Sequence, residues 1–153
     1  MKRKQFLLLG LIVVLASFLL GCYEKTDIDT EWQESALFVS GGYTMIGKQG
    51  RIGFIYDDSN NDRFYPNKEQ KYMWHLWGEK EELEGEFKVI ATHEDGRESI
   101  TLLDRHSLGG ANNGADQHVP SMMSLPESGL WKLDTYVGDN LFDTVFVKVH
   151  EKE

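Results

Sequence analysis

Alternation of apolar and polar residues constrains the fold of this chain more than any other feature. Near the C-terminus, Val145, Val147 and Val149 would share one face of an extended segment. Thr144 and Lys148 would share the opposite face. A period of two is typical of a half-buried β-strand, because successive side chains of a strand point to opposite faces. This part of the chain therefore cannot bury its apolar residues as an amphipathic helix.

The same signal recurs along the chain between turn residues and charged stretches. Strands are expected at 36–40, 43–47, 51–56, 71–77, 85–91, 99–103, 121–125, 129–137 and 143–150. The residues expected to face inward include Phe87, Val89, Ala91, Ile100, Leu102, Trp131, Leu133 and Val137. Gly138 and Asp139 favour a hairpin between the last two segments. The predicted fold is all-β, an immunoglobulin-like antiparallel β-sandwich, with a small β-barrel as the alternative.

The N-terminus opens with three positive charges and continues as an apolar run from Phe6 to Gly21. Its length lies between a signal-peptide core and a short membrane-spanning helix. The run ends in LLGC, with a branched residue three positions before Cys22 and a glycine directly before it. This ending resembles the lipobox of bacterial lipoproteins, in which the cysteine takes a diacylglyceryl group and a peptidase cuts before it. The resemblance implies that residues 1–21 are a removed signal peptide and that Cys22 is the lipid attachment site; an uncleaved anchor is the alternative.

Cleavage would leave residues 22–153, which is enough for one domain with a core. We expect 22–31 to carry the lipid and form a charged tether, and 32–153 to form the β-sandwich. The mature chain would carry 13 basic and 25 acidic residues, a net charge of −12. This charge argues against nucleic acid as a partner and against adhesion of the surface to anionic lipid headgroups. Stable anchoring takes two acyl chains. The predicted location is therefore the extracytoplasmic face of the cell membrane, with the lipid as the anchor.

The C-terminal half carries a family resemblance in the segments WHLWG, GEFKVIATH and residues 110–149, and most strongly in LPESGLWKLDTYVGDNLF. It resembles a family of uncharacterised lipoproteins from Gram-positive bacilli that carry an immunoglobulin-like sandwich and a domain of unknown function. The resemblance covers residues 30 to 150. Because the chain lacks paired cysteines, the likeness to antibody-type domains concerns architecture only. The resemblance implies no activity, no cofactor and no catalytic residue.

Two segments offer candidate ligand sites. Acidic and amide residues with nearly the spacing of a calcium loop are found between 58 and 69, namely Asp58, Asn60, Asp62 and Glu69. Arg63 stands where that loop needs its glycine, so we interpret the segment as a polar connection and keep a calcium site as the alternative. In the segment KYMWHLW, Trp74 and Trp77 are interpreted as part of a strand buried on both faces. A platform on which these two side chains stack against a sugar ring is the alternative. His93, His106 and His118 lack the short spacing of a zinc site.

The glycine-rich and asparagine-rich segment LGGANNGADQHVP, residues 108–120, is long for a connection in a small domain. Asn113-Gly114 predicts a tight turn, and Gly109-Gly110 permits positive φ angles. The segment is interpreted as a structural crossover loop, with a ligand or partner loop as the alternative. In the second case, its polar groups would come from Asp104, Arg105, His106, Asn112, Asn113, Asp116 and His118.

Hydrolase motifs are absent from the sequence: it has neither G-x-S-x-G nor S-x-x-K, and the only cysteine is assigned to the lipid. We therefore expect a non-enzymatic binding or interaction module without a cofactor. Its partner would be an envelope protein or a wall polymer. The alternative is a carbohydrate-binding module of the cell wall or a degenerate hydrolase that uses Trp74 and Trp77.

Overall fold

The structure is a computed structural model that describes residues 32–97 and 99–151. The predicted signal peptide, Cys22 and the tether lie outside the described residues, and the division of the chain into these parts stays a prediction. Within the described part, no helix is long and apolar enough to cross a membrane.

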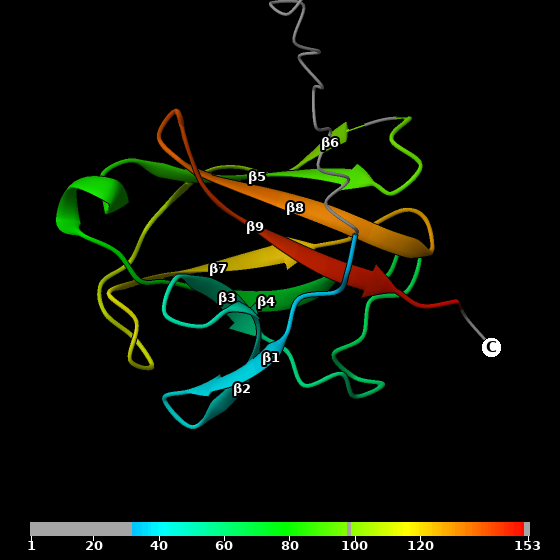
Figure 1. Cartoon of the computed structure of the whole chain (residues 1–153), viewed down its shortest axis with the longest axis horizontal. Helices are drawn as coiled ribbons and strands as arrows, with labels where there is room; N and C mark the ends of the chain where they lie inside the picture. Colours follow the sequence, from blue (N-terminus) through cyan, green and yellow to red (C-terminus); the bar gives the residue numbers. More distant parts are fainter. Residues whose placement is uncertain (1–31, 98, 152–153) are drawn as a thin grey trace, which may run out of the picture. The chain divides into compact units, whose positions relative to one another are not determined.

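Antiparallel pairing joins the strands of Figure 1 throughout both sheets. The strands are β1 (Leu37–Ser40), β2 (Tyr43–Lys48), β3 (Ile52–Ile55), β4 (Gln70–Leu76), β5 (Glu86–His93), β6 (Ser99–Ser107), β7 (Gln117–Met123), β8 (Gly129–Val137) and β9 (Asn140–Val149). A single 3₁₀ turn, η2 (Lys80–Leu83), lies between β4 and β5. Each segment in which alternation predicts a strand contains one.

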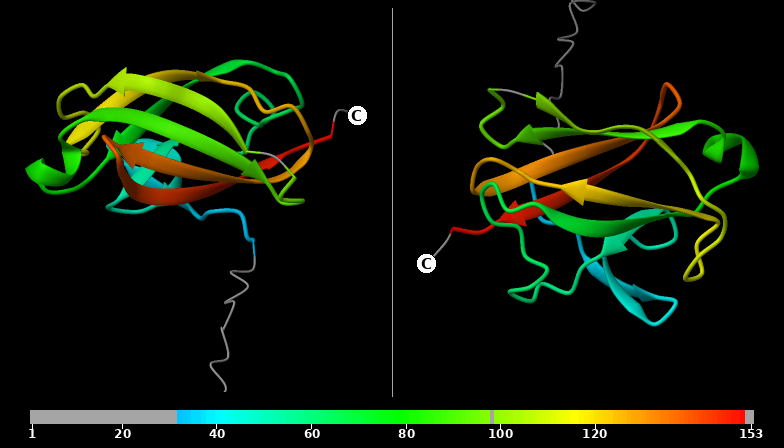
Figure 2. Two further views of the ribbon diagram at one scale, coloured as in Figure 1. Left: turned by 90° about the horizontal axis from the view of Figure 1, so that it is seen from above. Right: turned by 180° about the vertical axis from the view of Figure 1, so that it is seen from behind.

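The strands form two separate sheets, with the order β1-β2-β3-β4-β7 in one and β6-β5-β8-β9 in the other. Figure 2 shows the two layers from above and from behind. The predicted immunoglobulin-like antiparallel β-sandwich is therefore confirmed, and the barrel alternative is wrong because neither sheet closes on itself. The chain crosses between the layers after β4, after β6 and after β7.

Aromatic side chains fill much of the space between the sheets. The ring of Trp74 on β4 lies 4.7 Å from that of Phe54 in its own sheet and 5.4 Å from that of Phe87 in the opposite sheet. Phe87 and Trp74 are fully buried, and burying one large apolar side chain contributes roughly 1.5–3 kcal/mol. The inward positions predicted in β5, β8 and β9 are all buried.

Strand β6 departs from the expected alternation. Val89 pairs with Leu103 while Ile90 pairs with Thr101, so Leu102 is an extra residue in the ladder. Such a bulge turns the following side chains to the other face. Leu103 is consequently buried, whereas Ile100 and Leu102 are only partly buried against the core. The strand then continues to Ser107, beyond the predicted end at residue 103.

Strand β7 begins four residues earlier than predicted. Gln117 to Pro120 pair with β4 and belong to the strand, so the connection after β6 covers only residues 108–116. A proline within a strand obscures the signal, because it lacks the N–H donor that a central strand needs. Here Pro120 is tolerated because β7 is an edge strand that pairs only with β4.

Candidate functional site

Four segments gather at one end of the sandwich, on the right in Figure 1. They are residues 57–69, 94–97, 124–128 and 148–151, and we call this region the loop end. Backbone hydrogen bonds join them: the N–H of His150 donates to the carbonyl of Phe64 at 2.9 Å, and that of Asn67 donates to Leu125 at 2.9 Å. These bonds fix loops that are distant in sequence against one another.

A groove of about 930 Å³ opens at the loop end. Its walls come from the 57–69 segment, the start of β8 and the end of β9. The lining residues are Asn60, Arg63, Tyr65, Lys68, Glu94, Ser128, Gly129, Lys148, Val149, His150 and Glu151. Polar and charged side chains predominate, and three of them are cations. The chain as a whole has a net charge of −9, so this composition distinguishes the groove from the rest of the surface.

The cation Arg63 is held in place by the loop that carries it. Its Nε donates to Oδ1 of Asp58 at 2.9 Å, and one Nη donates to Asn60 at 3.3 Å. The hydrogen bond and the charge of Arg63 lower the pKa of Asp58. Among the described residues, Asp58, Asp62 and Glu69 do not gather as a group that could hold a metal ion. This favours the polar connection over the calcium site of Asp58, Asn60, Asp62 and Glu69. Arg63, in place of the glycine, takes the oxygen ligands itself.

Two lysines of the groove form no ion pair among residues 32–97 and 99–151. The Lys68 ammonium donates to the carbonyl of Asn61 at 3.4 Å and lies 5.3 Å over the Tyr65 ring. The exposed ammonium of Lys148 forms no ion pair within the described part. Burial first, and then the charges of Arg63 and Lys148, lower the pKa of His150, although Asp58 opposes them. His150 is therefore an uncharged residue of the groove lining near pH 7.

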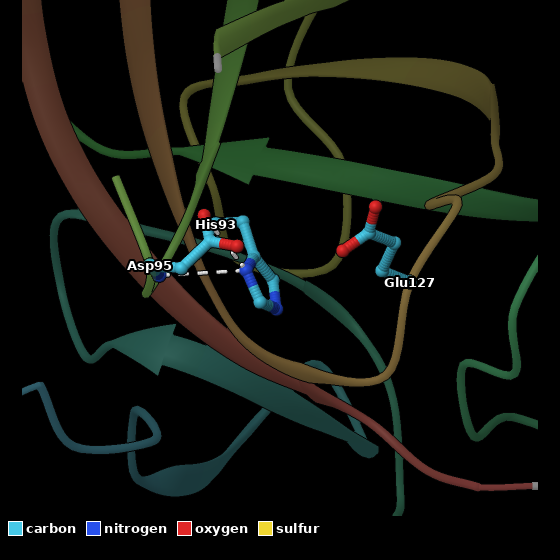
Figure 3. Close-up of side chains that lie close together, drawn as sticks. All are labelled: His93, Asp95 and Glu127. Atoms are coloured by element: carbon cyan, nitrogen blue, oxygen red, sulfur yellow. Dashed lines mark hydrogen bonds and ion pairs between the residues drawn. The ribbon is translucent and has the colours of Figure 1, made fainter. Parts of the chain in front are cut away.

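A second cluster at the loop end joins His93, Asp95 and Glu127, shown in Figure 3. Nδ1 of His93 lies 3.2 Å from Oδ1 of Asp95, and its Nε2 lies 3.0 Å from the carbonyl of Ser128. One ligand atom from each of the three residues lies within 4.8 Å of the others, a spacing that a metal ion would accept. The guanidinium of Arg97, however, binds Asp95 and lies 3.8 Å from Glu127. Any metal would have to displace this cation.

The environment of His93 favours its protonated form, which pairs with the carboxylate of Asp95 and needs no metal ion. Burial opposes the charge, but the Ser128 carbonyl and the Asp95 carboxylate together raise the pKa of His93. Arg97 lowers the pKa of Asp95 to about 2. The indole N–H of Trp131 donates to the backbone carbonyl of Glu127 at 3.0 Å, and its ring lies 5.0 Å from that of His93. The arrangement is an ion-pair clasp between the β5–β6 and β7–β8 connections.

The three histidines considered for zinc do not converge. His106 pairs with Phe87, six residues along β5 from His93, a separation of roughly 20 Å at the rise of a strand. His118 belongs to the other sheet, where its Nδ1 donates to the carbonyl of Gly110 at 2.7 Å. Close packing against the His118 ring also explains why position 109 is a glycine, since a Cβ there would lie 2.7 Å from that ring. Neither Gly109 nor Gly110 has a positive φ.

The 108–116 connection lies at the end of the sandwich opposite the groove. Asn113 and Gly114 both have positive φ, 49° and 83°, and the flanking Asn112 and Ala115 exchange backbone hydrogen bonds. This is the predicted tight turn, of the type I′ hairpin form. The tip is fastened on three sides: Asn113 contacts His75 at 3.0 Å, the indole of Trp77 donates to Gly114 at 2.6 Å, and Ser40 donates to Asn113 at 2.9 Å.

The residues proposed for a ligand loop do not lie together in one place. Asp104, Arg105 and His106 lie on strand β6, which runs to Ser107, and are separate from the loop. Asp116 accepts a hydrogen bond from the N–H of Gly78 at 3.1 Å. With Asn113 and His118, it is used in holding the crossover. This geometry favours the structural interpretation of the segment over the ligand loop.

The predicted tryptophan platform is wrong. Trp74 has no exposed surface and belongs to the core between the sheets. Trp77 directly follows β4 and is half-buried, and its ring lies 5.9 Å from that of Phe38, away from the core side that Trp74 occupies. Two aromatic side chains on opposite sides of a sheet cannot stack together on a sugar.

The comparisons with known proteins agree with this architecture. Residues 22–147 match the domain of unknown function DUF4871. The chain belongs to this family. It is also similar to a crystal structure of a candidate lipoprotein from Bacillus anthracis, with a TM-score of 0.61 and 21% identity over 80% of this chain and 89% of that one. At this identity the DUF4871 chain shares the fold with that protein. No match was found among curated proteins.

Sequence reasoning missed the groove altogether. Its walls come from segments more than eighty residues apart, joined where Phe64 bridges to Val149. The local signal was a pair of short basic stretches, RFYPNK and KVH, neither of which resembles a motif. Only the return of β9 alongside the 57–69 segment brings their cations together.

Proposed function

We propose that this DUF4871 protein is a membrane-anchored extracytoplasmic lipoprotein whose domain is a non-enzymatic binding module. The observation that carries the binding role is the polar groove at the loop end. It is sizeable, it is lined by charged side chains that have few partners, and it is framed by loops that hydrogen bonds hold in place. A pre-formed concave site with convergent polar groups is the usual form of a ligand site.

The anchoring part of the proposal rests on the sequence around Cys22 and on a relative. The lipobox-like ending of the apolar run supplies the acylation site. The structurally similar protein from Bacillus anthracis is described as a candidate lipoprotein. A diacylglyceryl group provides the two chains that stable anchoring takes, since burial contributes about 0.8 kcal/mol per CH₂.

The non-enzymatic part of the proposal is supported by the hydrogen-bond partners of the serine hydroxyl and histidine groups in two surface depressions. Next to the groove, the imidazole of His93 bonds to the carbonyl of Ser128, and Ser128 is the serine that lines the groove. Beside β6, Ser121, Asp104 and His106 line a second depression, yet the Ser121 hydroxyl donates to the carbonyl of Tyr72 at 3.3 Å. Neither place joins a hydroxyl to a base, the geometry that an activated serine requires.

Substitution of the cysteine tests the anchor. In cells fed labelled palmitate, wild-type protein should incorporate the label and sediment with membranes. Cys22→Ser should remain unlabelled, because serine offers no thiol for the thioether. Equal labelling of both proteins would contradict the lipid assignment.

A pull-down from detergent-solubilised cells tests the binding role. We expect a protein or polymer to be retained by the wild type and lost from a variant with Arg63→Ala and Lys148→Ala in the groove. Lys80→Gln serves as the matched control, because Lys80 is exposed on η2. The same partners recovered with all three proteins would exclude the groove as the binding site.

A further inference from the structure

We propose that the groove at the loop end binds a phosphate-bearing anion, either a phospholipid headgroup or a soluble phosphate ester. The inference rests on the proposed binding function and names the chemistry of its ligand. Three cations, from Arg63, Lys68 and Lys148, line one concave surface of a chain whose net charge is −9.

The carboxylates near the groove are largely engaged elsewhere. Asp58 is bound to Arg63. Glu94 accepts a hydrogen bond from the N–H of Leu130 at 3.0 Å, which directs it to the start of β8. The remaining lining acid, Glu151, lies at the exposed end of the chain. Asp62 lies near enough to Lys68 for the lysine charge to act on its pKa. Neither Lys68 nor Lys148, however, forms an ion pair in the part of the chain that the structure describes.

Pre-positioned donors distinguish this groove from a random group of surface lysines. Asp58 and Asn60 fix the direction of the Arg63 guanidinium, which suits the planar, multidentate binding of phosphate oxygens. Nε2 of His150 is buried and has no hydrogen-bond partner among the described residues. It lies 3.7 Å from Asp58, too far for a hydrogen bond.

The groove favours an anion over an uncharged sugar. Tyr65 is the aromatic side chain in its lining, and the Lys68 ammonium covers a face of its ring at 5.3 Å. Stacking on a sugar needs an open ring face. The same lysine is well placed to meet negative charge.

The chain enters the folded domain beside the groove. Trp32 packs on Phe146 with the ring centroids 5.5 Å apart, and Glu34 accepts a hydrogen bond from the N–H of Lys148 at 3.3 Å. Nine residues of tether, 23–31, reach at most roughly 30 Å. If Cys22 carries the lipid, a headgroup phosphate is within range of the groove.

The test uses the full-length lipoprotein held in nanodiscs. In neutral phosphatidylcholine discs, inorganic phosphate and glycerol phosphate are titrated by calorimetry. In a separate arm, discs containing phosphatidylglycerol are compared with neutral discs by hydrogen exchange of the backbone around residues 60–68 and 148–151. Three proteins are compared: wild type, the double variant Lys68→Gln/Lys148→Gln, and Lys80→Gln as the control.

Wild type and Lys80→Gln should bind phosphate or gain protection in anionic discs, and added salt should weaken the effect. The double variant should bind about tenfold more weakly or worse, the loss expected for removing two charge-assisted contacts. Binding in the soluble arm identifies a free phosphate ester as a source, and protection in anionic discs identifies the headgroup.

Absence of both effects would overturn the inference, as would equal binding by the double variant. Because the replaced lysines are solvent-accessible, the melting temperature of the double variant should stay near that of wild type, so that lost binding is not lost folding. If the pull-down still depends on the groove while phosphate fails to bind, the proposed binding function is retained and phosphate is excluded as its ligand.

Discussion

His75 is the buried residue on which the position of the 108–116 connection depends. Its Nδ1–H donates to the carbonyl of Met73 at 3.1 Å, so its Nε2 is the acceptor for the Asn113 amide at 3.0 Å. This bonding requires the neutral ring. Burial, and to a smaller extent the charge of His118, lower the pKa of His75, although the Met73 carbonyl opposes them.

Acidification should therefore destabilise the domain through His75. Its pKa is lower in the folded state than the unfolded value of about 6.5. As the pH falls below that value, the unfolded chain binds the proton first, and stability is lost at up to about 1.4 kcal/mol per pH unit. Urea unfolding at pH 7.5 and 5.5 measures the effect. His75→Gln keeps an acceptor for Asn113 without titrating, so it should lose less stability than the wild type over this interval.

The pKa shift of His93 has the opposite sign to that of His75. The contribution of His75 can therefore be isolated only by comparing the wild type with His75→Gln. The pKa of His93 is raised, so its stabilising contribution is complete below the unfolded pKa and is lost as the pH rises through the folded one. Acidification to pH 5.5 thus strengthens the clasp while it weakens the His75 contact. If wild type and His75→Gln respond identically to acid, the role assigned to His75 is wrong.

At the scale of elements, alternation located the strands, and the errors fall where another interaction overrides it. In β6 the bulge at Leu102 changes which face is buried. In β7 the proline and the polar residues before it obscure a strand that pairing with β4 stabilises. The tight turn at Asn113-Gly114 was predictable because its φ angles demand those residues. Its fastening to His75 and Trp77 depends on partners 38 and 37 residues away.

The two glycines of the 108–116 connection should respond differently to alanine. Gly114 has a φ of 83°, and a Cβ there would lie 3.0 Å from the Ser40 hydroxyl. Gly110 has ordinary backbone angles and open space around it. Denaturant unfolding should show a loss of about 1–2 kcal/mol for Gly114→Ala. Gly110→Ala should be close to neutral, and equal effects at both positions would contradict the turn geometry.

At the scale of the whole molecule, the sandwich and the groove differ in how far the sequence specifies them. The inward faces of β5, β8 and β9 follow from local pattern, because a period of two assigns each side chain to a face. The groove follows from the return of β9 beside residues 57–69, a contact that no local pattern encodes. Trp74 shows the same limit: its residue type allowed a sugar platform, and only the packing against Phe87 in the other sheet assigns it to the core.

Adjacent positions on β9 provide a test of the sandwich as one cooperative unit. Val147 is fully buried and pairs with Trp131, whereas Lys148 is exposed at the groove. Val147→Asp places an unpaired carboxylate between the sheets, and this should cost about 4 kcal/mol or more. Lys148→Asp should cost about 1 kcal/mol or less, because water solvates the new charge.

Chemical denaturation followed by tryptophan fluorescence and by far-ultraviolet circular dichroism would measure both variants. In a domain of this size the two signals should report one transition, and Val147→Asp should shift it strongly or abolish the folded state. The position of Lys148 on the same strand controls for the effect of the charge itself. Comparable losses in the two variants would mean that β9 does not place alternate residues in the core, and the two-sheet architecture would have to be revised.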